Sequence, residues 1–190
     1  MPDAPATNGP EQDMVDLLLA QHARIEELFL LVIGSHGETR RDAFDDLTRL
    51  LAAHETAEEE VLHPLARTLP GGGGDAMVDD RLDEERRAKE TLQTLIDGGV
   101  DAGGFETGVI LLRDAVLRHA RYEERQEFPL LRQHVAADRL RALAATVRAA
   151  EAAAPTRPHP AAQSAKANLA LGPALAVTDK IRDAAHRPAE

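Results

Sequence analysis

The 190-residue chain contains no cysteine and no tryptophan. Without cysteine the protein can form no disulfide, offers no thiolate nucleophile and cannot hold an iron–sulfur cluster. The absence of disulfides suits a reducing compartment. The first twelve residues are polar and contain proline, unlike the basic and apolar segments of an export signal. We therefore expect a cytoplasmic protein.

Aromatic residues make up only 3% of the chain, and Lys and Arg do not gather into a basic block. Because a nucleic-acid surface normally combines a basic stripe with stacking aromatic side chains, the sequence predicts no nucleic-acid partner. The longest strongly apolar run, Leu28 to Ile33, is far too short to span a bilayer, so we expect no membrane association. No Gly-rich phosphate loop follows a strand, and no organic cofactor is expected.

What the chain does contain is helix-forming sequence. Breaks rich in Gly or Pro separate long stretches of Leu, Ala, Glu and Arg, and these breaks fall at 34–37, 70–74 and 98–104. No stretch alternates with the period of a strand. The pattern predicts helices at 11–33, 40–68, 76–97 and 105–134, with a helical extension near 135–152.

These helices predict an all-α fold class, an up-down-up-down antiparallel four-helix bundle, because short loops make consecutive helices antiparallel. The bundle with its extension covers residues 11–152. Residues 1–10 are expected to be disordered. Residues 153–190 form an Ala/Pro-rich tail. The tail is either disordered or carries a short helix after Pro173 that docks on the bundle.

Polar residues interrupt the face of each helix that should point to the core. Heptad-type spacing defines this core stripe. In the second helix the stripe is Phe44, Leu47, Leu51, His54, Glu58, Val61 and Leu65. In the fourth it is Val109, Leu112, Val116, His119, Glu123, Gln126 and Leu130. The first helix contributes His22 to its stripe, and the third contributes Glu85.

The six ionisable residues of these stripes predict a metal centre: His22, His54, Glu58, Glu85, His119 and Glu123. They lie near the helix midpoints, which meet at one level in an antiparallel bundle. Burying such groups unpaired is costly, and a bound metal pair is the simplest compensation. Each His-x-x-x-Glu pair lies on one helical face, so its carboxylate is well placed to bridge two ions. Mixed imidazole and carboxylate donors favour iron or manganese.

The two halves of the chain also resemble each other. The segment from His54 to Leu65 matches the segment from His119 to Leu130, including Pro64 and Pro129, at a constant offset. At these residues the sequence resembles the hemerythrin HHE cation-binding family, over about residues 11–150. HETAE (54–58), HARYE (119–123) and His22 match the family pattern in order and spacing.

The resemblance implies a non-haem centre of two iron ions, bridged by an oxo or hydroxo group, that binds oxygen or reacts with oxygen, peroxide or nitric oxide. An iron sensor or iron-binding regulatory protein is the alternative. The family histidine of the third helix is absent, and Glu85 stands in its place, with Glu84 or water as alternatives there. Three His and three Glu ligands favour harder ions such as ferric iron, which argues against reversible oxygen carriage.

Other polar residues near the site are expected to lie outside it. His63 follows His54 by nine residues, about half a turn round the helix, so it should point away. Lys89 is expected to extend its ammonium group to solvent, with an ion pair to Glu85 as the alternative.

Glu55 and Glu26 are outside candidates for ligation, and we expect both to lie on solvated helix faces. Tyr122 is the only tyrosine of the chain. We expect it to pack partly buried, with contact to an edge of the site as the alternative.

Overall fold

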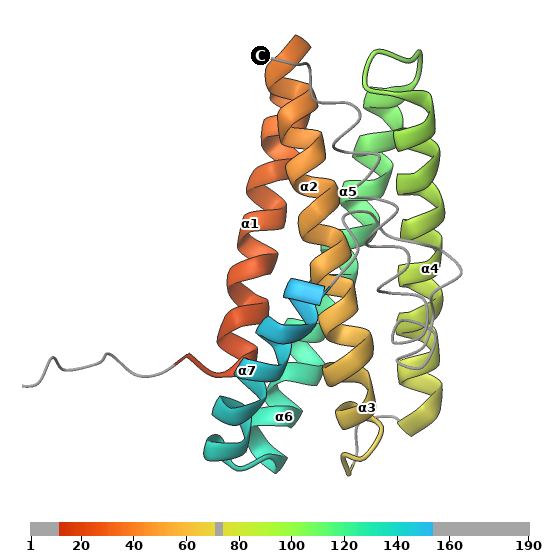
Figure 1. Ribbon diagram of the computed structural model, residues 1–190. Helices are drawn as coiled ribbons and strands as arrows, with labels where there is room; N and C mark the ends of the chain where they lie inside the picture. The colour runs from red at the N-terminus through yellow and green to blue at the C-terminus, as the bar shows by residue number, and fades with distance from the viewer. Residues whose placement is uncertain (1–11, 71–73, 154–190) are drawn as a thin grey trace, which may run out of the picture.

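The structure is a computed structural model that describes residues 12–70 and 74–153 (Figure 1). In these residues it contains helices and no strand. The helical elements are α1 (Met14–Gly34), α2 (Gly37–Ala57), the π-helical turn η1 (Glu58–Leu62), α3 (His63–Ala66), α4 (Gly74–Gly98), α5 (Phe105–Tyr122), the π-helical turn η2 (Glu123–Glu127), α6 (Phe128–His134) and α7 (Ala137–Ala153). The predicted all-α bundle is confirmed. The predicted disordered N-terminus and the tail beyond Ala153, with its possible helix, lie outside the described residues.

The long helices form four continuous rods that make up the bundle (Figure 1). They are α1, the continuous run α2–η1–α3, α4, and the continuous run α5–η2–α6. Helix α7 is the predicted extension. It turns back from the end of α6 and packs against α1 and α2. The bundle therefore has a fifth helix along the N-terminal half of α1.

Local sequence features determine where α1 begins and how closely α4 and α5 approach each other. Asp13 caps α1, because its side chain accepts a hydrogen bond from the amide of Asp16 at 2.9 Å, and the Asp16 side chain accepts one from the amide of Asp13 at 3.1 Å. Helices α4 and α5 approach each other at Gly108, where an added Cβ would lie 2.7 Å from a methyl carbon of Leu95. Glycine at this position permits the contact.

The two π-helical turns interrupt rods that the sequence predicted as regular α-helix. The amide of His63 donates to the carbonyl of Glu58, and the amide of Phe128 donates to the carbonyl of Glu123, each five residues back. A proline follows each turn, at the second position of α3 and of α6. Since proline donates no hydrogen bond and its ring crowds the carbonyl four residues earlier, a wider turn before it relieves the clash.

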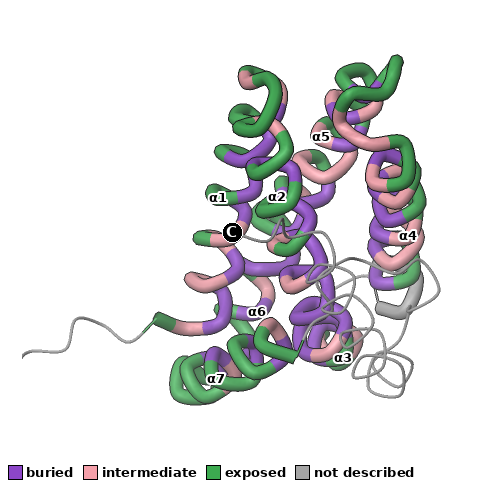
Figure 2. The backbone as a smooth tube through the Cα atoms, turned by 45° about the horizontal axis from the view of Figure 1, so that its top comes forward, coloured by how far each residue is buried: buried purple, intermediate pink, exposed green. Residues whose placement is uncertain are grey.

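Two apolar clusters fill the bundle and leave a polar level between them. One cluster contains Phe29, Phe44, Leu92 and Phe105 and lies toward the α1–α2 and α4–α5 loops. The other contains Leu18, Leu62, Leu131 and Val147 and includes the inner face of α7. Figure 2 shows the buried positions running along the faces where the helices meet. Within the described ranges, no helix is both long enough and apolar enough to cross a membrane.

Candidate metal centre

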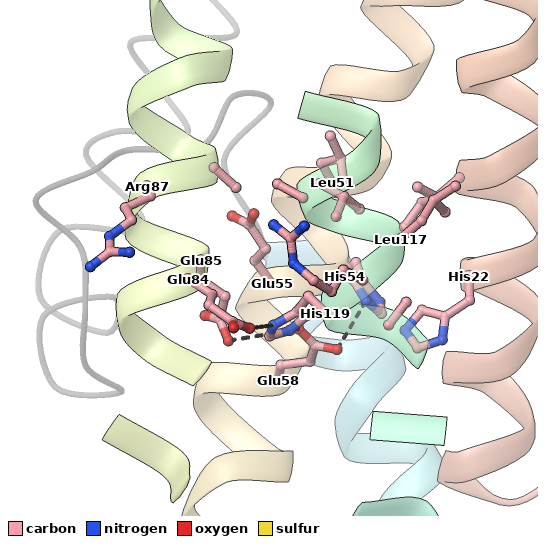
Figure 3. A pocket seen from close by; sticks show the side chains of 16 residues that line it. His22, Leu51, His54, Glu55, Glu58, Glu84, Glu85, Arg87, Leu117 and His119 are labelled. Atoms are coloured by element: carbon pink, nitrogen blue, oxygen red, sulfur yellow. Dashed lines mark hydrogen bonds and ion pairs between the residues drawn. The ribbon is translucent and has the colours of Figure 1, made fainter. Parts of the chain in front are cut away.

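All six residues predicted as ligands are buried at the level between the two apolar clusters. None is more than 8% exposed, and the carboxylates of Glu58 and Glu123 are fully buried. Figure 3 shows His22, His54 and His119 placed around Glu58, with Glu85 reaching in from α4. The structure thus brings together side chains from four rods, as the sequence predicted.

The six residues form two overlapping groups of donor atoms. In the first group, one atom from each residue lies within 4.8 Å of the others, and its members are His22, His54, Glu58 and Glu123. The second group meets the same criterion and contains Glu58, Glu85 and His119. Because Glu58 belongs to both groups, its two carboxylate oxygens can face two ions at once. The arrangement therefore consists of two adjoining groups of possible metal ligands that share a carboxylate.

The imidazole Nε2 atoms all point toward this shared region. Nε2 of His54 lies 2.9 Å from Oε1 of Glu58, and Nε2 of His22 lies 3.3 Å from Oε2 of Glu123. Nε2 of His119 is 3.8 Å from Oε2 of Glu58 and 3.5 Å from Oε1 of Glu123. Glu123 thus faces both His22 and His119, which makes it a second candidate for a bridging carboxylate.

The opposite ring nitrogen of each of these histidines is bound by an outer acceptor. Nδ1 of His54 donates to Oε1 of Gln21 at 2.6 Å. Nδ1 of His22 and of His119 donate to the carboxylates of Glu124 and Glu84, at 2.9 and 3.2 Å. Such a bond fixes the tautomer that leaves Nε2 free to bind a cation, and it is usual for histidines that ligate metals.

The inward donor atoms lack other partners. Nε2 of His22, Nε2 of His119 and both oxygens of Glu58 and Glu123 are buried and form no hydrogen bond of good geometry with the described residues. Buried polar atoms are nearly always satisfied in folded proteins, so a cluster of donors that the protein itself does not satisfy indicates a cation-binding site. All the donors are nitrogen or oxygen, which fits iron or manganese.

The pKa values of the inward histidines and carboxylates also indicate a cation-binding site. Burial lowers the pKa of His22 and His119, but the neighbouring carboxylates, Glu123 foremost and Glu58 after it, together outweigh this and raise both pKa values. Burial raises the pKa of Glu58, yet the charges of His54 and His119 hold it well below its usual value. The buried carboxylates thus favour the protonated, cationic form of the neighbouring histidines. A bound cation would supply this positive charge instead and would displace the histidine protons.

His63 lies in the site, and the prediction that it points away was wrong. Its side chain is 2% exposed, and its Nε2 lies 2.5 Å from Oε1 of Glu85. Glu85 Oε1 also lies 3.8 Å from Nε2 of His119. The π-helical turn explains the difference, because in it residue 63 returns to the face of Glu58 five positions earlier. Pro64, directly after His63, was the only local signal of the altered turn.

The second π-helical turn places Glu127 in the core, where the sequence predicted Gln126. Gln126 is exposed, whereas Glu127 is 1% exposed and neither of its oxygens has a partner among the described residues. Burial and the charge of Glu123 raise the pKa of Glu127 to about 7. The two turns, Glu58–Leu62 and Glu123–Glu127, are separated by the same offset of 65 residues as the sequence repeat.

A buried ion-pair cluster adjoins the site, which corrects two further predictions. Lys89 does not reach solvent but is 4% exposed. It pairs with Glu59, and its Nζ lies 3.6 Å from Oε2 of Glu55. Glu55 is 7% exposed, so it does not lie on a solvated face. The expected alternative, an ion pair of Lys89 with Glu85, is also not formed within 4 Å.

Two of the remaining expectations hold. Glu26 is exposed, as predicted for a solvated face. Tyr122 is half-buried, and the guanidinium carbon of Arg81 lies 3.9 Å above its ring. Arg81 in turn pairs with Glu84, which holds His119. Tyr122 therefore packs beside the outer acceptors rather than among the inward donors.

An access cavity of about 160 Å³ lies beside the donors (Figure 3). Its apolar lining includes Ile25, Leu51, Ala88, Ala115 and Val116, and its polar lining includes the donors of α1, α2, α4 and α5. Exposed side chains of Arg87 and Arg118 also line it, so the cavity reaches the surface between α4 and α5. A small molecule can therefore reach the donor atoms through a mainly apolar passage.

Comparison with known proteins identifies the family. A protein of Nostoc sp. strain PCC 7120, described as a DNA nickase, is 28% identical over 144 residues. The match covers 74% of this chain but only 40% of that protein, so the chain spans less than half of its relative's length. The crystal structure of a hemerythrin HHE cation binding domain-containing protein from Mycobacterium kansasii shares the fold, with a TM-score of 0.65 and 19% identity. That match covers 88% of this chain and 99% of the other.

The sequence also matches the family described as the hemerythrin HHE cation binding domain, over residues 13–131. This range contains every residue of the two donor groups. Helix α7 lies beyond it. The chain is a metal-binding protein of hemerythrin-like fold and belongs to the hemerythrin HHE cation binding domain family.

Proposed function

We propose that the protein is a non-haem di-iron protein that binds oxygen or reacts with oxygen, peroxide or nitric oxide. One observation carries the proposal: two groups of buried donors share the carboxylate of Glu58, and their imidazoles are already turned inward by outer hydrogen bonds. The ligands would be His22, His54, Glu58, Glu85, His119 and Glu123. When bound, an iron pair supplies redox chemistry and an open coordination position.

The donor set favours iron over a purely structural cation. A structural zinc site is usually closed by four ligands, often including thiolates, whereas this chain has no cysteine and offers donors for two ions. Glu85 replaces an imidazole with a carboxylate, which favours the ferric state. This favours reaction with oxygen or peroxide over reversible oxygen carriage.

The residues around the donors suit a small, uncharged substrate. The access cavity is lined by Ile25, Leu51, Ala88, Ala115 and Val116, so it excludes bulk water better than a polar cleft would. His54 and His119 are held in one tautomer by Gln21 and Glu84 and need no reorientation during reaction. The chain thus supplies preoriented donors and a mainly apolar access route that suits small molecules.

Metal content and the visible spectrum test the proposal. Protein from iron-supplemented cells should hold about two irons per chain and show charge-transfer bands between a bridging oxygen and iron. The double variant His54→Ala/His119→Ala should lose both. The matched control is His36→Ala/His134→Ala, since both of these histidines are exposed. A colourless wild-type protein with no tightly bound metal would refute the di-iron assignment.

One contact favours the alternative, an iron sensor without turnover. Glu151 of α7 accepts a hydrogen bond from Gln21, whose carbonyl oxygen holds His54. Helix α7 is therefore linked to a proposed ligand through two side chains. If the protein is a sensor, iron removal should increase hydrogen exchange across α7, which carries none of the proposed ligands, and peroxide should not be consumed. Unchanged exchange in α7 would exclude the sensor mechanism.

A further inference from the structure

A groove of about 800 Å³ lies along α5 and η2, bounded by residues of α1 and α4. We call it the arginine groove, because five of the residues that line it are arginines: Arg81, Arg113, Arg118, Arg121 and Arg125. Tyr122 and the carboxylates of Glu26, Glu84 and Asp114 also line it. The whole chain carries a net charge of −11. A surface region with so many guanidinium groups is therefore unlike the average surface of this protein.

The arginines of the groove differ in their ion pairs. The guanidinium of Arg113 lies 2.8 Å from the carboxylate of Asp114, which neutralises it. No described residue forms an ion pair within 4 Å of Arg118, Arg121 or Arg125, although Glu84 attracts Arg118 at longer range. These three side chains are also exposed. The groove thus contains more cationic than anionic side chains, and three of its guanidinium groups have no ion-pair partner within 4 Å among the described residues.

Helical geometry aligns the three exposed arginines. Arg118, Arg121 and Arg125 follow one another by three and four residues, so they project from one face of the α5–η2 rod. From the first to the third, the rise along the helix is about 10 Å. Guanidinium groups bind phosphate and carboxylate oxygens through paired hydrogen bonds. A row of this length matches an anion with more than one charged group.

Arg81 adds a fixed cation at the inner wall of the groove. It is 9% exposed, lies over the ring of Tyr122, and pairs with Glu84 at 2.8 Å. Because Arg81 is held in place before a ligand arrives, little side-chain entropy is lost on binding. Glu84 also lines the access cavity, as do Leu117 and Arg118. The groove therefore adjoins the mouth of that cavity.

We propose that the arginine groove binds a small polyanion that carries two or more phosphate or carboxylate groups. A long polyanion fits the groove less well, because the net charge of −11 repels it and the unpaired arginines span only about 10 Å. Bound there, the anion lies beside the mouth of the access cavity and next to the Glu84 carboxylate that holds His119. The site does not depend on iron, so it can exist whether or not the di-iron proposal is correct.

Isothermal titration calorimetry on the full chain, as purified, tests the site with tripolyphosphate, citrate, orthophosphate and a short DNA duplex. Tripolyphosphate or citrate should bind at moderate salt, and orthophosphate at least about tenfold more weakly. Added salt should weaken binding. Metal content measured after each titration identifies any heat that comes from chelation of metal.

Variants on the exposed arginines localise the binding. Arg118→Gln/Arg121→Gln/Arg125→Gln should weaken binding about tenfold or more, since three charge-assisted contacts are lost. The control Arg49→Gln/Arg141→Gln removes exposed arginines of α2 and α7 and should change nothing. The proposal is wrong if no multivalent anion binds at millimolar concentration or if the groove variant binds as tightly as wild type. It is also wrong if the duplex binds more tightly than tripolyphosphate, which would make the groove a nucleic-acid surface.

Discussion

Substitution of His63 by phenylalanine tests the most specific feature of the proposed metal centre. His63 is the buried partner that holds Glu85 at 2.5 Å, in a position where regular helix would have turned it away. In the internal repeat that matches residues 54–65 with residues 119–130, the position equivalent to His63 is Phe128, 65 residues later. The ring of Phe128 stacks on that of His22, with centroids 5.6 Å apart. The π-helical turn therefore accepts a phenylalanine ring, and His63→Phe should fold.

The expected effect is the selective loss of one metal ion. Removing the outer hydrogen bond to a metal ligand typically lowers metal affinity about 10- to 100-fold, or about 1.4 to 2.8 kcal/mol. The short, fully buried bond between His63 and Glu85 places this case toward the upper end. Glu85 belongs to the donor group of Glu58 and His119, while the group with His22 and His54 does not include it. At an iron concentration that just fills both sites of the wild type, the content should fall from about two ions per chain to about one in the variant.

Iron titration with a competing chelator, followed by Mössbauer spectroscopy on enriched iron, measures the affinity and shows which ion is lost. His63→Gln should restore part of the affinity, because its amide can donate to Glu85. His134→Phe changes an exposed histidine and should have no effect. If His63→Phe binds two ions with unchanged affinity, His63 does not position Glu85 for metal binding. Equal loss of both ions in His63→Phe and His63→Gln would indicate a general packing defect instead.

Three further substitutions probe the surroundings of the donors. Lys89→Met should lower the free energy of unfolding by about 3 to 5 kcal/mol in urea denaturation, because it removes the buried ammonium group that pairs with Glu59 and lies 3.6 Å from Glu55. Ala115→Leu, which narrows the access cavity, should slow the association of nitric oxide about tenfold or more in stopped-flow measurements while iron content stays constant. Gln21→Leu should weaken iron binding about tenfold in chelator competition, because Nδ1 of His54 loses its acceptor.

Matched controls separate these effects from general destabilisation. Arg87→Met removes an exposed cation of α4 and should change the unfolding free energy by less than about 0.5 kcal/mol. Ala142→Leu adds the same volume as Ala115→Leu at an exposed position of α7 and should leave association rates unchanged. If Lys89→Met is as stable as wild type, the buried cluster is not held together by charge. An unchanged rate in Ala115→Leu would place the route of small molecules elsewhere.

The sequence alone predicted the helical rods and the six candidate ligands, because both depend on a local property. Helical periodicity decides which residues of one helix share a face, and it put His54 with Glu58 and His119 with Glu123 on the core side. The breaks at Gly and Pro located the loops, and equal positions near the helix midpoints indicated a common level. Glu85 was included on the same reasoning and lies among the donors of the second group.

Only the tertiary structure decided which further polar residues join the site. His63 and Glu127 face the core because an extra residue is inserted in each π-helical turn, and the stability of such a turn depends on what the whole bundle packs around it. Lys89 and Glu55 are buried because α4 lies against α2 at a rotation that the sequence of neither helix fixes. Gln21, Glu84 and Glu124 hold the histidines across helices, and contacts between helices have no periodic signal within one helix. Local sequence thus set each helix's inward face, and the packing of helices against one another set which side chains meet there.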